Sequence, residues 1–373
     1  MEFLSERGAL AESVAWAARV LPARSPVPVL GGLLLDASDG RLRVSGLDFE
    51  ASASVEAEAA TVRPGRVLVM GRRLLDICKV LPGGPVRCAV EGSRFTVAAS
   101  DARFGLSVLP LDDYPALPPL PELRGAVDAG EFAAAVADVA VAAGRDDTLP
   151  ALTGIRLRLD GSTMTLAASD RYRYAVRTLP WKAADPEVAA DVLVSARRLT
   201  EIARTLGRSG PVSVALDTGS VGFEHAGART TVRLLDGRLP SHDTLFALAD
   251  PAVAVTDRAA LVEAVRRVSV VADGGSPLQL TFNGGPDASV LLQAGYEDDV
   301  ASQRLPATLE GADGLTVAFN PVYLMDALSS FEEPTIRLSL MGAGRRAMVT
   351  AGEATPDTAA HRHLLMSVKQ SVL

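Results

Sequence analysis

The chain is poor in cysteine and histidine, and it contains no long apolar run. Only two cysteines, Cys78 and Cys88, occur in 373 residues, and neither has the spacing of a metal site. Because so few thiols are typical of proteins in a reducing compartment, we expect a cytoplasmic protein. We expect both cysteines to be buried and to act as small apolar residues. No run reaches the roughly 18 apolar residues of a transmembrane helix. The first residues also lack the basic start and apolar stretch of a secretory signal.

Catalytic signatures are equally scarce. No HExxH, GxSxG, Walker loop or helix-opening GxGxxG is present. His361 and His363 would share one face of a strand, but no third ligand lies near them in sequence, so we predict no metal site. The acidic pairs at 112–113 and 146–147 are best explained as exposed loop charges. We therefore expect no cofactor, no catalytic residue and no enzymatic activity.

The chain contains an internal sequence repeat that occurs three times, at intervals of roughly 120 residues. Each copy has two halves, and each half is a helix followed by strands of alternating polarity. The six helices begin near Leu10, Arg72, Phe132, Arg197, Leu261 and Val322. The spacing is too long for a solenoid unit and fits a repeated domain. With 373 residues, 48% of them hydrophobic, the chain is able to bury several cores.

We predict an α+β fold of three similar domains, each built from two helix-plus-antiparallel-sheet halves. Proline-dense linkers near 114–121 and 239–251 place the domains at 1–122, 123–250 and 251–373. Alternating runs separated by turn residues predict hairpins, with Asp160-Gly161 as the turn of one of them. These hairpins are expected over 87–98, 155–168, 212–224 and 335–350.

The net charge of −8 argues against a protein that coats itself with nucleic acid. It does not exclude one that is basic on one face and acidic on another. Segments 71–80 and 195–209 together carry seven basic and two acidic residues. They are either a basic surface or ordinary solvated helix faces, and composition leaves both interpretations open.

Two segments are unusual for surface structure. The stretch 168–177 reads ASDRYRYAVR, and in a strand Tyr172 and Tyr174 would share one face opposite the arginines. It is either a binding surface rich in interface anchors or an edge strand covered by arginine stems. The chain end, 361–373, carries an apolar run that either lines a groove for a partner peptide or completes the last sheet.

These residues, in this order, resemble the beta subunit of bacterial DNA polymerase III, the sliding clamp. The resemblance covers the whole chain, and the high usage of Ala, Arg and Val is similar to that of high-GC actinobacterial sources. The motifs that carry it are LPARSPVPVLGGLLLDA (21–37), RFGLSVLPLDDYPALP (103–118), TLPALTG (148–154), ASDRYRYAV (168–176), TTVRLLDGRLPSHDTLF (230–246), AFNPVYLMDAL (318–328) and LLMSVK (364–369).

The resemblance implies a processivity factor, active in DNA replication and repair, that encircles double-stranded DNA without reading its sequence. It implies a head-to-tail homodimer, a ring of six domains with helices around the hole and sheets outside. The partners implied are the polymerase III alpha subunit, the clamp loader and repair proteins, all docking through short linear motifs. No membrane partner and no cofactor are implied.

The resemblance also assigns residues. It assigns DNA contact to Arg24, Arg72, Arg73 and Arg197. It assigns ring closure to Phe104 and Leu106 at one end and to Arg267, Val270 and Val271 at the other. It assigns the client-peptide pocket to Leu152, Ser169, Arg171, Tyr172, Arg173, Tyr174, Pro240, Leu245, Leu364, Met366, Ser367 and Val368.

Several positions depart from the family pattern, and they fall on or near the pocket. Arg171 stands where many relatives have glycine, Ser367 where proline is usual, Lys369 where arginine is usual and Thr244 where a basic residue is common. An alternative is therefore a specialised clamp paralogue with an altered client or inhibitor pocket. Two further alternatives are an enzyme on a repeated scaffold and a ring that acts as a scaffold without DNA.

Overall fold

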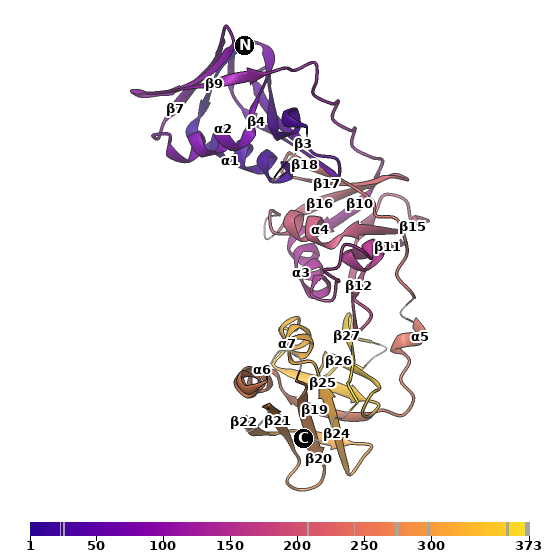
Figure 1. The fold of residues 1–373 in the computed structure, drawn as a ribbon. Coiled ribbons are helices and arrows are strands. Elements are labelled where there is room, and N and C mark those ends of the chain that lie inside the picture. The colour runs from indigo at the N-terminus through magenta and orange to yellow at the C-terminus, as the bar shows by residue number, and fades with distance from the viewer. Residues whose placement is uncertain are drawn as a thin grey trace. The chain divides into compact units, whose positions relative to one another are not determined.

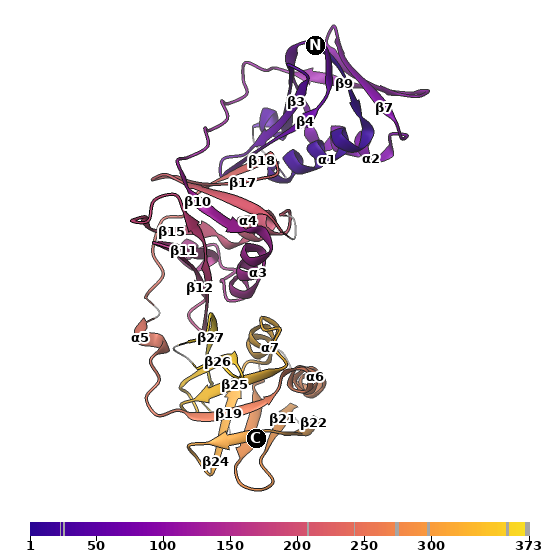
Figure 2. The ribbon, with the colours of Figure 1, turned by 180° about the vertical axis from the view of Figure 1, so that it is seen from behind.

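The computed structural model describes residues 1–22, 24, 27–206, 209–241, 243–272, 276–296, 299–355 and 358–369. The chain divides into two compact units. Figures 1 and 2 show its helices and strands from opposite sides. Unit 1 comprises Met1–Ala126 and Gly210–Leu234, and unit 2 comprises Val127–Ser209 and Leu235–Leu373. Among the described helices, none is long and apolar enough to cross a membrane.

Unit 1 is a curved antiparallel sheet with two helices on it. The helices α1 (Arg7–Ala17) and α2 (Gly71–Val80) pack against each other and against the sheet. In order across the sheet, the strands are β16 (Pro211–Leu216), β17 (Ser220–His225), β18 (Ala228–Arg233), β4 (Ala51–Glu58), β3 (Arg41–Leu47), β2 (Gly32–Ser38), β6 (Gly65–Met70), β9 (Ala102–Leu109), β8 (Arg94–Ala99), β7 (Pro85–Glu91), β1 (Glu2–Glu6) and β5 (Ala60–Arg63). β10 (Leu123–Asp128) spans the boundary between the units.

The core of unit 1 follows from two sequence periods. Leu10, Val14 and Ala17 recur at helical spacing on α1 and are fully buried. Leu33 and Leu35 alternate with outward residues on β2 and are buried beneath that helix face, in the same cluster. Each such leucine contributes about 1.5–3 kcal/mol through burial, so the helix stripe and the strand face hold each other in place.

The described helices of unit 2 are α3 (Ala129–Ala140), α4 (Ala196–Ala203), α5 (Asp243–Phe246), α6 (Arg258–Val268) and α7 (Pro321–Ser329). Four of them begin at side-chain caps. Asp128, Ser195, Asp257 and Asn320 each accept hydrogen bonds from first-turn amides of α3, α4, α6 and α7. Such caps satisfy amides that have no partner inside the helix and fix where it starts. α3 packs on α4, and α6 packs on α7.

Two antiparallel sheets lie under these helices. The larger runs in the order β15 (Ala189–Ser195), β11 (Gly154–Asp160), β12 (Thr163–Ser169), β13 (Arg173–Pro180), β27 (His361–Met366), β26 (Arg346–Ala351), β25 (Thr335–Leu340), β19 (Ala252–Asp257) and β23 (Thr308–Glu310). The smaller runs in the order β22 (Asp299–Pro306), β21 (Ser289–Tyr296), β20 (Leu278–Asn283) and β24 (Gly314–Phe319). The short strand β14 (Lys182–Ala183) completes the set of described strands.

The joint between β13 and β27 positions the candidate site. Tyr174 pairs with Leu364, and Arg177 pairs with His361, so the end of the chain lies beside a strand near its middle. The apolar chain end therefore completes a sheet, as one of the two interpretations of that segment predicts. In Figures 1 and 2, β27 lies next to β26, with α7 close by.

The predicted helices and hairpins are confirmed at their positions. The predicted α+β fold of helices on antiparallel sheets also agrees with the structure, while the domain boundaries at 122/123 and 250/251 stay a prediction. One prediction is wrong: β13 begins at Arg173, so Tyr172 precedes the strand and does not share a face with Tyr174. β13 also lies between β12 and β27, which excludes the edge-strand interpretation.

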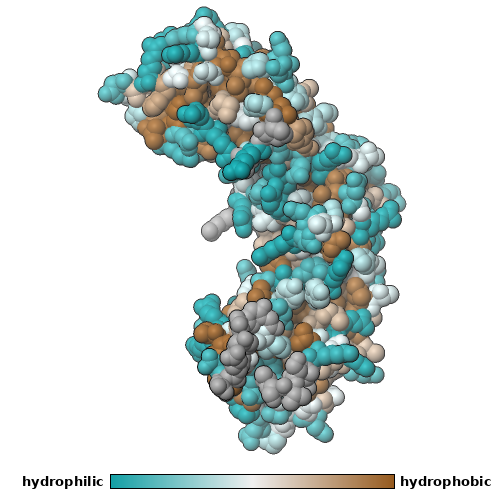
Figure 3. Space-filling model, viewed as in Figure 1, coloured by the Kyte–Doolittle hydropathy of each residue, from teal (hydrophilic) through white to brown (hydrophobic). Residues whose placement is uncertain are grey.

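The face of the molecule shown in Figure 3 is mixed in polarity. In the space-filling view, hydrophilic and hydrophobic residues are interspersed over the visible face of each unit (Figure 3). Docking surfaces are therefore found from particular residues, not from a broad apolar or charged field.

Candidate functional site

A hollow of about 490 Å³ opens in unit 2 beside α7. One wall is the segment that follows α3, a second is the turn between β12 and β13, and a third is the start of α7. The lining residues are Ala143, Gly144, Arg145, Asp146, Leu149, Leu152, Asp170, Arg171, Tyr172, Arg173, Val322, Tyr323 and Asp326. The lining combines apolar and aromatic side chains with six charged ones, and a hollow that combines apolar surface with polar groups is a candidate binding site.

The turn from Ser169 to Arg173 is fixed by its own side chains. The Asp170 carboxylate accepts hydrogen bonds from the amides of Tyr172 at 3.0 Å and Arg173 at 3.1 Å. The Ser169 hydroxyl accepts from the Arg171 amide at 3.2 Å and donates to the Arg173 carbonyl at 2.8 Å. Arg171 has φ of 84°, a left-handed conformation that favours glycine. The turn leaves Tyr172 59% exposed at the rim of the hollow.

Arg173 ties this turn to α7. Its side chain is buried, and its guanidinium pairs with Asp170 at 2.9 Å and with Asp326 at 2.6 Å. The same guanidinium lies over the Tyr323 ring, 4.4 Å from the centroid, and Tyr323 in turn stacks on Tyr172 at 6.2 Å. A buried cation with two carboxylates and an aromatic face is fully partnered. The network holds both tyrosine rings at the hollow.

Tyr174 belongs to a compact apolar cluster. Its members are Ala167, Tyr174, Val176, Phe246, Met348 and Leu364, with Leu245 and Leu248 packed on it. The Tyr174 hydroxyl donates to the Pro240 carbonyl at 2.8 Å, and its ring meets the Phe246 ring edge-on at 5.7 Å. Burial raises the pKa of Tyr174, so the hydroxyl stays protonated and able to donate.

The segment after β27 is anchored by backbone bonds on three sides. The amide of Met366 donates to the Tyr172 carbonyl, that of Ser367 to Arg345, and that of Val368 to Ala318, at 2.8–2.9 Å. The Ser367 hydroxyl also accepts from the Arg345 amide at 3.0 Å. Met366 and Val368 remain exposed. An apolar ledge therefore lies next to Tyr172.

The structure brings together part of the predicted pocket. Leu152, Arg171, Tyr172 and Arg173 line the hollow, and Met366 and Val368 lie exposed beside Tyr172. The other predicted pocket residues are packed in the cluster, hydrogen-bonded or at its border: Ser169, Tyr174, Pro240, Leu245, Leu364 and Ser367.

Sequence reasoning missed Val322, Tyr323 and Asp326 of α7, which line the hollow. Val322 is 60% exposed, a property that the sequence does not reveal, so no sequence signal identifies these residues.

The predicted DNA-contacting arginines are exposed in each unit. In unit 1, Arg24, Arg72 and Arg73 are exposed, and the Arg72 guanidinium donates to the Pro22 carbonyl at 3.2 Å. This bond places Arg72 beside the segment that carries Arg24. Lys79 on the same helix is paired with Asp76 at 2.8 Å, which neutralises its charge locally.

In unit 2, the exposed cations of α4 and the turn that follows it are Arg197 and Arg204. Arg198, counted in the predicted basic face, is instead buried and contacts Glu201 at 3.4 Å. Arg208 of the predicted basic segment lies outside the described residues.

Free strand edges occur in both units. In the described part of unit 1, β9 pairs only with β8 from Ala102 to Ser107, because its pairing with β6 is confined to Val108 and Leu109. In the described part of unit 2, β22 pairs only with β21. Unpaired edges present free amides and carbonyls that favour addition of another strand.

The residues predicted to close a ring lie near these edges. Phe104 is half-buried on β9, whereas Leu106 is buried within the core of unit 1. Arg267 is exposed on α6, Val270 is 81% exposed and Val271 is half-buried in the turn that follows. Val300 on β22 is exposed as well and was not predicted.

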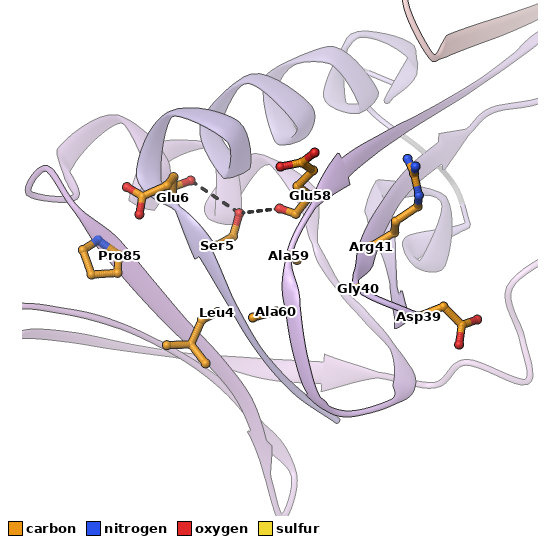
Figure 4. A pocket seen from close by; sticks show the side chains of 10 residues that line it. All are labelled: Leu4, Ser5, Glu6, Asp39, Gly40, Arg41, Glu58, Ala59, Ala60 and Pro85. Atoms are coloured by element: carbon orange, nitrogen blue, oxygen red, sulfur yellow. Dashed lines mark hydrogen bonds between the residues drawn. The ribbon is translucent and has the colours of Figure 1, made fainter.

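A second hollow, of about 620 Å³, lies in unit 1 between β1 and the β3–β4 hairpin (Figure 4). Ser5 at its base donates towards the Glu58 carbonyl at 3.4 Å. Its lining mixes Glu6, Asp39 and Glu58 with Arg41, and no sequence motif points to it.

His361 and His363 are buried in β27. His361 lies 2.9 Å from the Ser330 hydroxyl and 3.1 Å from the Val176 carbonyl, and burial lowers its pKa to about 4. Burial raises the pKa of Cys78 to about 11, so this thiol is unreactive at neutral pH. Among the described residues, no group of three or more His, Cys, Asp or Glu is arranged to hold a metal ion.

Comparison with known proteins gives three consecutive family matches. The N-terminal domain of the DNA polymerase III beta subunit matches residues 1–118, the central domain matches 126–241 and the C-terminal domain matches 245–367. The beta sliding clamp of Streptomyces coelicolor is 46% identical over 379 residues, covering 100% of both chains. A beta sliding clamp homolog, GriR, from Streptomyces muensis is 41% identical over 375 residues, covering 99% of each.

Solved structures agree with these matches. The DNA polymerase III subunit beta of Pseudomonas aeruginosa superposes with a TM-score of 0.92 at 25% identity, over 99% of this chain and 100% of that one. The same relative has been solved bound to griselimycin, also with a TM-score of 0.92, 25% identity and the same coverage.

Proposed function

This chain belongs to the DNA polymerase III beta subunit family and is a DNA sliding clamp; we propose that it works as a closed homodimeric ring, without catalysis, around duplex DNA. Ring closure is supported by the free edge of β9 in unit 1 and the free edge of β22 in unit 2. In a head-to-tail contact, the β9 edge of one protomer meets the β22 edge of its partner. Two such contacts, related by rotation, use both edges of each protomer and close a ring. Such a ring acts where chromosomal DNA is, which agrees with a cytoplasmic protein.

We propose that the exposed arginines Arg24, Arg72, Arg73 and Arg197 face the DNA. They are exposed cations on or beside α2 and α4, and the net charge of the chain is −8. Contacts of guanidinium groups with phosphates are independent of sequence and are weakened by salt, so they guide the duplex without holding it at one place. Retention is then supplied by topology.

We propose that clients dock in the groove formed by the hollow beside α7 and the ledge of Met366 and Val368. Supporting this are the apolar and aromatic side chains of the lining together with the exposed side chains of Tyr172, Met366 and Val368, which suit a peptide with apolar anchors. The polymerase III alpha subunit, the clamp loader and repair proteins are the expected clients. Griselimycin, bound by the Pseudomonas aeruginosa relative, is a further ligand to test here.

A specialised paralogue with an altered pocket remains a second candidate. Two observations favour it. Arg171 adopts a left-handed conformation at the groove rim, and the Ser367 amide donates to Arg345, a bond that proline is unable to make. The two candidates are distinguished by measuring the affinity of one client peptide for this clamp and for another clamp of the same organism. A main replicative clamp is expected to compete fully for the peptide, whereas a specialised paralogue is expected to have a different affinity for it.

The proposal of a ring rests on the free edges of β9 and β22. It is tested by measuring the molar mass in solution by light scattering. The wild type is expected to have twice the 38.9 kDa mass of the chain. A double variant, Val270→Asp with Val300→Lys, removes two exposed apolar side chains near the β22 edge and is expected to be monomeric. Val62→Lys, an exposed valine on β5, is the matched control and stays dimeric. A monomeric wild type at micromolar concentration would contradict the ring.

A further inference from the structure

Trp16 is a large aromatic residue on α1 that lies outside the core under this helix. The core cluster there contains Leu10 and Val14, which recur at helical spacing, but it does not contain Trp16. Trp16 is instead half-buried at the helix surface. Arg19 lies three residues further on, in the short helix η1 (Ala18–Val20), and its guanidinium lies over the Trp16 ring, 4.9 Å from the centroid. The two side chains therefore form a surface pair.

The charge of Arg19 is not neutralised by a carboxylate in the described part of the chain. Burial of part of its side chain lowers the pKa of the guanidinium, and no acidic residue opposes this shift. By contrast, Arg43 and Arg87 donate hydrogen bonds to Glu56 and Glu2, respectively. A cation that has lost part of its hydration and has no counter-ion gains from contact with an anion. Because stacking uses the face of the guanidinium, the N–H groups at its edge stay available for a bidentate contact with a phosphate.

The pair lies where the end of α1 meets the start of α2. η1 contacts α2, and α1 and α2 lie side by side in both views of the ribbon (Figures 1 and 2). After η1 the chain passes Pro22, whose carbonyl accepts a hydrogen bond from Arg72 at 3.2 Å, and reaches the exposed Arg24. Arg73 is exposed next to Arg72. Arg19 therefore belongs to one group of cations with the three arginines of unit 1 that are proposed to face DNA.

We propose that Arg19 is a further phosphate contact of the duplex in unit 1, and that Trp16 is the positioning residue that holds it. This inference rests on the proposed contact with DNA and adds two residues to it. The ring restricts a long, flexible side chain before DNA arrives, so less conformational entropy is lost when the phosphate binds. The contact is independent of sequence, because every base pair presents the same phosphates.

The role of Arg19 is tested with the full-length clamp and a fluorescein-labelled DNA duplex of mixed sequence. Affinities are measured by fluorescence anisotropy between about 50 and about 200 mM salt. Arg19→Gln removes the charge and nearly keeps the length of the side chain. It is expected to lower the slope of log K against log salt by about 0.9 for each Arg19 of the ring that contacts a phosphate. Arg94→Gln, at an exposed position on β8, is the control and is expected to keep the wild-type slope.

The role of Trp16 is tested through its effect on Arg19. Trp16→Leu is expected to weaken duplex binding about three-fold, the equivalent of one exposed cation–π contact. Trp16→Phe keeps a ring under the guanidinium and is expected to retain most of the affinity. In the Arg19→Gln background, Trp16→Leu is expected to have no further effect, because the ring then has no guanidinium to hold. A loss of equal size in both backgrounds would show that Trp16 does not act through Arg19.

Two further outcomes decide against the proposal. If Arg72→Gln lowers the salt slope and Arg19→Gln leaves it unchanged, the role of Arg19 is wrong while contact with DNA stands. If neither variant changes the slope, the assignment of the DNA-facing arginines is itself wrong. A labelled single strand of the same sequence is the second probe. If Trp16→Leu weakens binding of the single strand more than that of the duplex, the ring stacks on unpaired bases, which overturns its role in holding Arg19.

Discussion

At the scale of single residues, Arg171 holds a backbone conformation that disfavours any side chain. Its φ of 84° lies in the left-handed region, where a Cβ atom costs about 1 kcal/mol. We expect Arg171→Gly to raise the free energy of unfolding by about 1 kcal/mol in urea denaturation. Arg171→Ala is the control: it removes the charge but keeps the Cβ, and it should give no gain. Equal stability of the glycine and alanine variants would show that backbone strain is absent.

His361 should make the clamp sensitive to acid. Burial lowers its pKa from 6.5 to about 4 in the folded protein, so between these values the unfolded state binds a proton that the folded state excludes. Stability is therefore present above about pH 6.5 and falls as the pH drops towards 4, at about 1.4 kcal/mol per pH unit for this site. His363 is fully buried with a lowered pKa and adds an effect of the same sign.

The measurement is urea unfolding from pH 7 to pH 4 for the wild type and for His361→Asn, which has no titrating ring. The variant is expected to lose part of the pH dependence, although it is less stable at pH 7 because no imidazole ring packs on Phe331. His225→Gln on β17 is the control and should keep the full dependence. An unchanged slope in the His361 variant would contradict the assignment.

At the scale of elements, the basic sides of α2 and α4 should set the salt dependence of DNA contact. Gly71, Leu74 and Cys78 bury one side of α2, which leaves Arg72 and Arg73 exposed. Arg72→Glu with Arg197→Glu is expected to weaken DNA association and to lower the slope of log K against log salt by about 0.9 for each phosphate that is no longer neutralised. Arg94→Glu, an exposed residue of β8, is the control. If both variants behave alike, the helices are not the DNA-facing elements.

The elements of the fold that are predictable from sequence are those with a regular period or a local turn preference. Helical and alternating periods identify α1 and β2 because burial of one side imposes the period, and the turn at Asp160-Gly161 follows from local backbone preference. The expectation that Tyr172 and Tyr174 share one face of a strand is wrong, since the Asp170 side chain bonds to the Tyr172 and Arg173 amides in a turn and β13 begins only at Arg173. Local patterns do not reveal such competition.

The groove was only partly predictable for a related reason. Family resemblance names Tyr172 and Tyr174 alike, but their exposure is opposite, because β27 pairs with β13 and Phe246 packs on Tyr174. These partners are far apart in sequence, so no window of residues contains the contact. The role of Tyr323 depends in the same way on Arg173, which joins the β12–β13 turn to α7.

At the scale of the whole molecule, the proposed retention of the clamp on DNA depends on topology. In this chain 45 acidic residues outnumber 37 basic ones, for a net charge of −8. Such a chain binds DNA weakly by attraction alone, so tight grip is not what holds it. Free strand edges in each unit supply the means of closing two copies into a ring. A closed ring stays on DNA because it is threaded, and it slides because no base is read.

Retention on circular and linear DNA tests this claim most directly. The clamp is loaded by its ATP-dependent loader onto a nicked plasmid, the loader is removed, and half of the sample is cut once with a restriction enzyme. The lifetime of labelled clamp on the two forms is then measured in moderate salt. We expect the clamp to remain on the circle and to leave the linear form rapidly through its ends. Equal lifetimes on the two forms would show that the protein adheres to DNA instead of encircling it.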